Sequence, residues 1–109
     1  MLIIRRGSTP RITCRVPEPI DMESILNIWI YLYQRGDVIV DKLYNDVEKD
    51  YENRTLAVTL TQEESLALKE GVANLQVRLY FETGASMPSQ EVQVRVLGVG
   101  KGGVMTSED

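Results

Sequence analysis

Histidine is absent from this chain, and cysteine occurs once. The lack of histidine removes the commonest general base, the commonest metal ligand and every Ser-His or Cys-His catalytic arrangement. With Cys14 as the only cysteine, no disulfide can form within the chain, which is typical of a protein folded in a reducing cytoplasm. We therefore predict a non-enzymatic protein with no catalytic residues, no metal and no cofactor.

Apolar runs long enough to cross a bilayer are also missing. The N-terminus places apolar side chains before Arg5 and Arg6, which is the reverse of the order in a secretory signal. The net charge is −4, a poor electrostatic match for a phosphate backbone. We expect a protein that is made in the cytoplasm and that binds neither nucleic acid nor membrane.

The dominant pattern is an alternation of apolar and polar residues. It is typical of strands with one face on a core and the other in water. The alternation predicts strands at residues 12–16, 56–60, 73–81 and 92–96. Residues 25–34 and 38–43 are predicted to form an antiparallel hairpin around Arg35-Gly36-Asp37, because Gly and Asp tolerate the left-handed backbone of tight turns. Residues 2–6 add a short edge strand.

One segment departs from this alternation. Thr61 and Glu64 form a capping box, in which Thr61 caps the start of a helix and Glu64 reaches back to it. The motif predicts a helical turn over residues 61–70, with Gly71 as its stop. Six to seven short strands and one short helical turn favour an all-β fold, an immunoglobulin-like antiparallel β-sandwich, with a small barrel as the alternative.

Two polar segments are expected to lie outside the strands. Residues 44–53 are interpreted as a mobile acidic loop, whose alternating carboxylates could offer oxygens to Ca²⁺ but lack the EF-hand pattern. Residues 99–109 are rich in Gly, which predicts a flexible C-terminal tail. The sandwich domain is therefore assigned to residues 1–98.

Cys14 belongs to one of the alternating strands. It alternates with Ile12 and Val16, which places all three side chains on the core face. Cysteine is among the residues most often buried, whereas a reactive thiol needs an electropositive, accessible environment. We predict that Cys14 is a core residue and not a nucleophile.

The strand predicted at residues 25–34 is apolar on both faces. One face is sufficient for the core and carries Leu26, Ile28, Ile30 and Leu32. The other face carries three aromatic residues, and the outer faces of the strands expected beside it carry Arg and Tyr. The candidate protein interface therefore consists of Trp29, Tyr31, Tyr33, Arg78, Tyr80 and Arg95.

Aromatic and Arg side chains are enriched at protein interfaces, and Arg stacks well on Trp and Tyr. The alternative is that the aromatic residues are covered by the chain's own 44–53 loop or by its tail. An exposed face predicts a contact surface, and a covered face predicts a second, internal layer of packing.

Three passages resemble those of a known group of proteins: Arg5-Arg6-Gly7-Ser8-Thr9-Pro10, residues 56–65 and residues 71–78. They are similar to small prophage-encoded structural proteins of Gram-positive bacteria, and to the immunoglobulin-like N-terminal domain of phage upper baseplate proteins. The resemblance spans most of residues 3–98. It implies a bacterial phage protein that is made in the cytoplasm and built into the virion, without enzymatic activity, and it transfers no functional residues.

The predicted function is a phage or prophage virion structural or assembly protein of tail or baseplate type, acting through protein–protein contacts. Its partners would be itself, as a homo-oligomer, or other virion proteins. The alternative is a carbohydrate-binding β-sandwich module that uses the aromatic strand face as a stacking platform. A small enzyme is the third reading, which the missing histidine makes the weakest.

Overall fold

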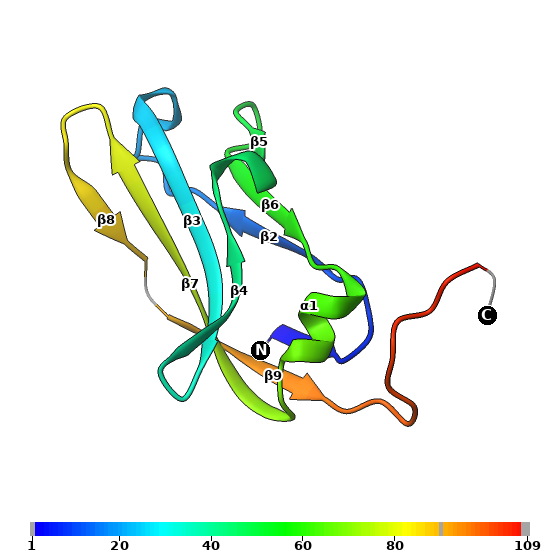
Figure 1. The fold of residues 1–109 in the computed structure, drawn as a ribbon. Helices are drawn as coiled ribbons and strands as arrows, with labels where there is room; N and C mark the ends of the chain where they lie inside the picture. The colour runs from blue at the N-terminus through cyan, green and yellow to red at the C-terminus, as the bar shows by residue number, and fades with distance from the viewer. Residues whose placement is uncertain (1, 90, 108–109) are drawn as a thin grey trace.

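The structure, a computed structural model, describes residues 2–89 and 91–107. Two sheets pack face to face (Figure 1). The larger sheet has the order β1 (Leu2–Arg5), β9 (Val92–Leu97), β7 (Gly71–Phe81), β3 (Ile25–Gln34) and β4 (Asp37–Lys42), with β8 (Ser86–Pro88) also paired to β7. The smaller sheet has the order β2 (Arg11–Arg15), β6 (Thr55–Thr59) and β5 (Glu48–Asp50). The predicted β-sandwich is confirmed, although the described residues form nine strands, with β5 and β8 in addition to the seven expected.

The core lies between the two sheets. Strands β1, β3, β7 and β9 direct alternate side chains inward to meet those of β2 and β6, as the period of two predicted. The most deeply buried large side chains are Ile4, Ile28, Ile30, Leu32, Leu56, Val58, Leu60, Leu68 and Val94. The same alternation leaves the opposite face of each sheet available for contacts.

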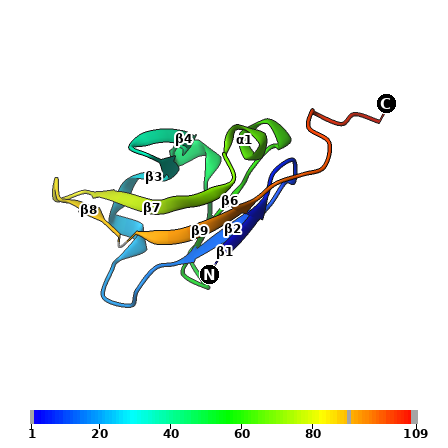
Figure 2. The same ribbon diagram turned by 90° about the horizontal axis from the view of Figure 1, so that it is seen from below.

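Among the strands that the structure describes, pairing is antiparallel except between β1 and β9. β1 runs parallel to β9, with Leu2 opposite Val94 and Arg5 opposite Leu97. Beyond Arg5 the chain crosses at Gly7, whose φ is 85°, to the smaller sheet, where it begins β2. Figure 2 shows β1 beside β9 and β2 nearby. The predicted edge strand is therefore present, but the sandwich is not antiparallel throughout.

The predicted core face of β3 is wrong at one position. Leu26 was assigned to the core, but its side chain is 53 % exposed, and Ile25 is buried instead. The cause is a β-bulge, since Ile25 pairs with Phe81 while Asn27 pairs with the adjacent Tyr80. An extra residue in one strand reverses the faces on its far side.

The β3–β4 hairpin forms as predicted, although a different pair of residues adopts the left-handed backbone. Arg35 has φ 52° and Gly36 has φ 85°, whereas the sequence pointed to Gly36 and Asp37. Asp37 is instead the first residue of β4 and pairs with Gln34. Positive φ at two successive turn residues matches the twist of the flanking strands.

The capping box is confirmed, but the helix is shorter than predicted. α1 spans Gln62–Ala67, with Glu64 N donating to Thr61 Oγ1 at 3.1 Å and Thr61 N donating to Glu64 Oε1 at 2.9 Å. Leu68 is already extended and fully buried, so core packing ends the helix before Gly71. Two short 3₁₀ helices, η1 (Met22–Ser24) and η2 (Tyr44–Asp46), lie before β3 and after β4.

The segment 44–53 forms regular structure where the sequence predicted an irregular loop. It contains η2 and β5, and Val47 is buried in the core. Lys49 Nζ lies 3.9 Å from the centroid of the Tyr44 ring and donates to the carbonyls of Tyr44 and Val47 at 3.0 and 2.9 Å. The acidic composition of the segment gave no indication that Val47 would be buried or that Lys49 would bind the carbonyls of the turn.

The tail after Gly98 carries no helix or strand as far as residue 107 and runs away from the two sheets (Figures 1 and 2). Met105 is hydrogen-bonded to the Gln62 side chain in both directions, at 2.7 and 3.0 Å. The flexibility of residues 99–109 stays a prediction, and its last two residues lie outside the described residues. No helix in the described part of the chain is long and apolar enough to cross a membrane.

Candidate interaction surface

The outer surface of the larger sheet brings most of the predicted interface residues together. β3 and β7 pair so that Trp29 lies opposite Arg78 and Tyr31 opposite Gln76. Residues that are opposite in a sheet share one face. We call this surface the aromatic face and define it as Trp29, Tyr31, Tyr33, Arg78 and Tyr80.

Trp29 and Tyr80 are the most exposed aromatic residues of this face, at 41 % and 45 %. The Arg78 guanidinium carbon lies 5.0 Å from the centroid of the Trp29 ring, within the range of a cation–π contact. Arg78 Nη2 also contacts Ser86 Oγ at 3.4 Å. A shallow depression of about 280 Å³ opens here and is lined by Asn27, Trp29, Arg78, Leu79, Tyr80 and Ser86.

Tyr31 and Tyr33 are half-buried and lie next to each other along β3. Their ring centroids are 6.0 Å apart, with the planes tilted by 37°. The Tyr31 hydroxyl donates to Gln76 Oε1 at 2.7 Å, so its polar end is bound within the sheet. Tyr31 and Tyr33 therefore contact each other, and Tyr31 also bonds to Gln76 on β7, whereas Trp29 exposes more of its ring to solvent.

A carboxylate controls the ionisation of Tyr33. The hydrogen bond with the Glu91 side chain, together with burial and the negative charge of Glu91, raises the pKa of Tyr33 to about 12. The hydroxyl therefore donates to the Glu91 carboxylate and keeps its proton further into the alkaline range than an ordinary tyrosine does. Both tyrosines are oriented by polar partners, which favours a preorganised surface.

Arg95 is not beside the aromatic row, contrary to the expectation from the sequence. Its cross-strand neighbours are Val72 on β7 and Ile3 on β1, so β7 separates it from β3. In the sequence, Arg95 alternates correctly onto the outer face, but pairing register alone decides which residues it meets. Sequence reasoning also did not name Asn27 and Ser86, which line the depression. The alternation of the 25–34 strand places Asn27 on the same face as Trp29, whereas Ser86 carries no pattern that could have identified it.

The alternative to an interface was that the 44–53 segment or the C-terminal tail covers the aromatic face. The 44–53 segment belongs to the smaller sheet and its preceding turn, and its Val47 and Tyr44 pack against the core. The tail is bonded to α1 through Met105 and Gln62. Within the described residues, the exposed parts of Trp29 and Tyr80 are therefore left uncovered by either segment.

The remaining candidates for chemistry are the Cys14 thiol and the carboxylate side chains. Cys14 points between the sheets but is only half-buried, so it lines the margin of the core instead of lying inside it. Burial raises the pKa of the Cys14 thiol, which lowers its reactivity. Among the described residues, no group of three or more His, Cys, Asp or Glu side chains is arranged to hold a metal ion.

Neither a family model nor a curated protein matches this sequence. Solved structures with a similar fold include CopC from Methylosinus trichosporium OB3b, with a TM-score of 0.56, 11 % identity, and coverage of 93 % of this chain and 89 % of that one. A strand-swapped dimer of the immunoglobulin-like domain of mouse leukocyte-associated immunoglobulin-like receptor 1 matches with a TM-score of 0.50, 13 % identity, and coverage of 88 % and 86 %. These similarities establish the immunoglobulin-like fold.

Proposed function

We propose that this chain is a non-enzymatic assembly module that binds other proteins through the aromatic face. The observation that carries the proposal is the exposure of Trp29 and Tyr80 beside Arg78, on a face that the described parts of the loop and tail leave open. Trp, Tyr and Arg are the residue types that most often dominate binding energy at protein interfaces. Contact with a partner would remove their apolar surface from water.

The proposed setting is a phage or prophage particle, with a second copy of the chain or another virion protein as the partner. This part of the proposal rests on the sequence resemblance to small phage structural proteins. The immunoglobulin-like sandwich is compatible with it, because the fold supports contact surfaces without any catalytic requirement.

Carbohydrate binding is the second candidate, because the depression joins the rings of Trp29 and Tyr80 to the polar side chains of Asn27 and Ser86. Two features favour a protein partner. Arg78 lies over the Trp29 ring, where a stacked sugar would lie. The planes of Tyr31 and Tyr33 are tilted by 37° and do not form a flat platform.

The test is the double variant Trp29→Gln, Tyr80→Gln. We expect it to weaken self-association in sedimentation equilibrium, or binding to isolated phage particles. It should cost about 1 kcal/mol of folding stability at most, the scale of an exposed cation–π contact. The matched control is Tyr51→Gln, because Tyr51 is 51 % exposed and follows β5 on the smaller sheet. The control should change neither quantity.

Three results would contradict the proposal. One is a double variant that loses several kcal/mol of stability with unchanged association, since that would make the face a packing layer. Another is binding on a glycan array that disappears with Trp29→Gln, which would establish the carbohydrate alternative. The third is absence of the chain from purified particles by mass spectrometry, which would exclude the virion setting.

A further inference from the structure

Within the described residues, β2 is an edge strand of the smaller sheet and pairs only with β6. Two hydrogen bonds define the direction of its backbone groups. Val16 N donates to Arg54 O at 2.8 Å, and Leu60 N donates to Pro10 O at 3.0 Å. In an antiparallel ladder the bonded positions alternate. The even-numbered residues of this segment therefore bond to β6, and the odd-numbered residues direct their N–H and C=O groups to the open edge.

The three odd-numbered residues of β2 are Arg11, Thr13 and Arg15. Within residues 2–89 and 91–107, their backbone N–H and C=O groups have no hydrogen-bond partner in the chain. A row of available donors and acceptors is a template for another strand. In the part of the chain that the structure describes, no neighbouring strand closes this edge, and no proline interrupts β2.

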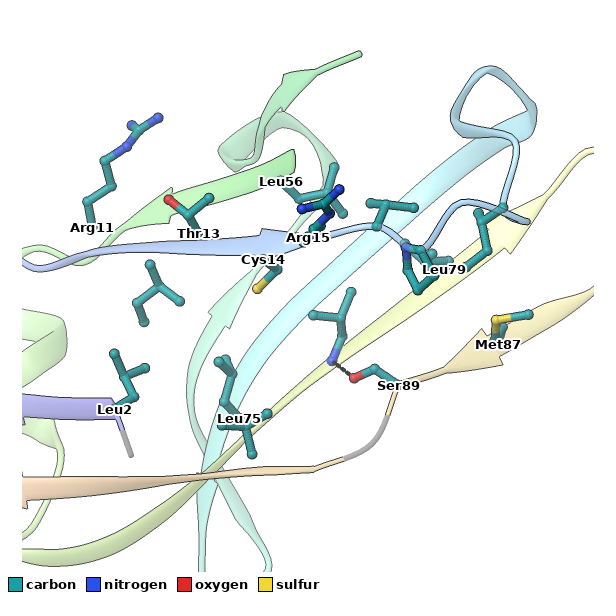
Figure 3. A pocket seen from close by; sticks show the side chains of 16 residues that line it. Leu2, Arg11, Thr13, Cys14, Arg15, Leu56, Leu75, Leu79, Met87 and Ser89 are labelled. Atoms are coloured by element: carbon teal, nitrogen blue, oxygen red, sulfur yellow. Dashed lines mark hydrogen bonds between the residues drawn. The ribbon is translucent and has the colours of Figure 1, made fainter. Parts of the chain in front are cut away.

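An apolar groove of about 610 Å³ lies beside this edge, between the two sheets (Figure 3). Cys14 and Leu75 point into it, whereas Arg11 and Thr13 point to the opposite side of β2. Its lining includes Cys14, Leu56, Leu75, Val77, Leu79 and Met87. Met87 is 45 % exposed at the rim, so the sandwich is open along this side.

An occupant that pairs with the open edge of β2 must also fit the apolar groove beside it. A strand added to β2 would lie about 4.8 Å beyond it, with alternate side chains directed toward the larger sheet. Those side chains would enter the groove, and the intervening ones would emerge beside Arg11, Thr13 and Arg15. The occupant must therefore be apolar at every second position. It must also supply backbone N–H and C=O groups to the edge of β2, which a compact apolar ligand lacks.

Charge determines which kind of strand fits. Arg11 is paired with Glu48, but Arg15 makes no ion pair within the described residues. If two copies paired through β2 in the antiparallel register that aligns the whole strand, Arg11 of each copy would lie opposite Arg15 of the other. Like charges directly opposite destabilise a strand pair, whereas acidic residues there would stabilise it.

We propose that β2 receives an extended segment of another protein, apolar at alternate positions and acidic at the positions between them, as an additional strand of the smaller sheet. This surface is separate from the aromatic face, which lies on the outer side of the larger sheet. One chain could therefore hold two partners at once. Main-chain hydrogen bonds would supply affinity, and the groove would select the side chains.

The test uses the full chain and the synthetic peptide acetyl-Glu-Val-Asp-Val-Glu-Val-Asp-amide. We expect binding that protects the amide hydrogens of Arg11, Thr13 and Arg15 from exchange. The peptide should also slow the reaction of Cys14 with Ellman's reagent by about tenfold or more, because the thiol lines the groove. Since Cys14 is the only cysteine, the reaction reports on this site alone.

The matched variants are Thr13→Pro and Thr13→Val. Thr13 N–H points away from β6, so proline removes a donor at the open edge without removing a bond within the sheet. We expect Thr13→Pro to weaken peptide binding by about tenfold, the scale of one lost hydrogen bond, and Thr13→Val to bind as the parent.

A second measurement leaves the protein unchanged, in case Thr13→Pro does not fold. Two peptides are N-methylated, one at the valines and the other at the acidic residues. One of them loses the N–H groups that face β2, and the other loses those that face solvent. Their affinities should therefore differ by about tenfold or more.

Four results would overturn the proposal. They are no peptide binding at millimolar concentration, equal binding of both methylated peptides, and equal binding of a peptide with lysine in place of every acidic residue. The fourth is protection of Cys14 by dodecanoate but not by the peptide, which would make the groove a site for apolar small molecules. All four leave the outcome at the aromatic face unaffected, so the two proposals are separable.

Discussion

Ser65 is a buried polar residue whose removal should be costly. Its side chain has no exposed surface, although it is on a short surface helix. Ser65 Oγ accepts a hydrogen bond from Gly7 N at 3.0 Å and donates to Ser8 O at 2.7 Å. It therefore holds the chain between β1 and β2 against α1. Ser65→Ala removes these two bonds and a longer one from Ser65 Oγ to Gln62 O at 3.2 Å, while leaving the backbone unchanged.

The magnitude follows from the groups left behind. Ser65→Ala leaves Gly7 N–H and Ser8 C=O without their partner, and a buried unsatisfied group costs about 1–3 kcal/mol. Alanine recovers at most about 0.5 kcal/mol through its higher helix propensity. Because both groups are only partly buried, water can compensate in part. We expect a net destabilisation of about 2 kcal/mol, a large fraction of the stability of a domain of this size.

The assay is urea unfolding followed by tryptophan fluorescence, with the midpoint and the slope compared between variants. Ser8→Ala is the control, because Ser8 Oγ donates to Arg5 O, and Arg5 O also accepts from Ser8 N at 3.2 Å. Ser8→Ala should stay within about 0.5 kcal/mol of the parent. A Ser65→Ala variant as stable as Ser8→Ala would refute the reasoning, since it would show that neither backbone group depends on the hydroxyl.

Two further predictions concern other tertiary contacts. Gln34 is buried, and its side-chain amide accepts from Lys69 N at 2.9 Å and donates to Lys69 O at 2.8 Å. Gln34→Met should therefore cost about 2 kcal/mol in the same unfolding assay. A cost near zero would contradict the role of these two hydrogen bonds. Partial burial alone would raise the pKa of Glu64, but the hydrogen bond and charge of Lys42 Nζ at 2.6 Å and the bonds with Thr61 hold that pKa below its usual 4.5. The resulting stability is therefore present above about pH 4.5 and is lost as pH falls through the lowered folded-state pKa. Lys42→Met should destabilise the protein by about 1 kcal/mol at pH 7 and by less in acid. An equal loss at both pH values would contradict this prediction.

Taken together, the two proposals assign two different kinds of recognition to one small domain, one at the aromatic face and one at the groove beside β2. The face is a side-chain surface built on the paired strands β3 and β7. The groove combines an open backbone edge with an apolar lining. Under these proposals the chain would bind two partners by different contacts, one dependent on aromatic and Arg side chains and the other on main-chain pairing.

Local features of the sequence predicted most of the elements. The alternation in β2, β6, β7 and β9 identified strands and their buried faces, because a strand directs successive side chains to opposite sides. Thr61 and Glu64 identified the start of α1, because both bonds of a capping box form within one turn. The sequence also placed Trp29 and Arg78 on outer faces, since each follows from its own strand's alternation.

Only the tertiary structure decided which strands and side chains meet. The bulge at Leu26, the parallel pairing of β1, the regular structure of the 44–53 segment and the separation of Arg95 from β3 all depend on contacts between distant residues. The same is true of the open edge of β2, because no pattern within Arg11–Arg15 states whether a further strand covers it. Alternation is a property of one strand, whereas register, neighbours and uncovered edges are properties of the assembled sheets.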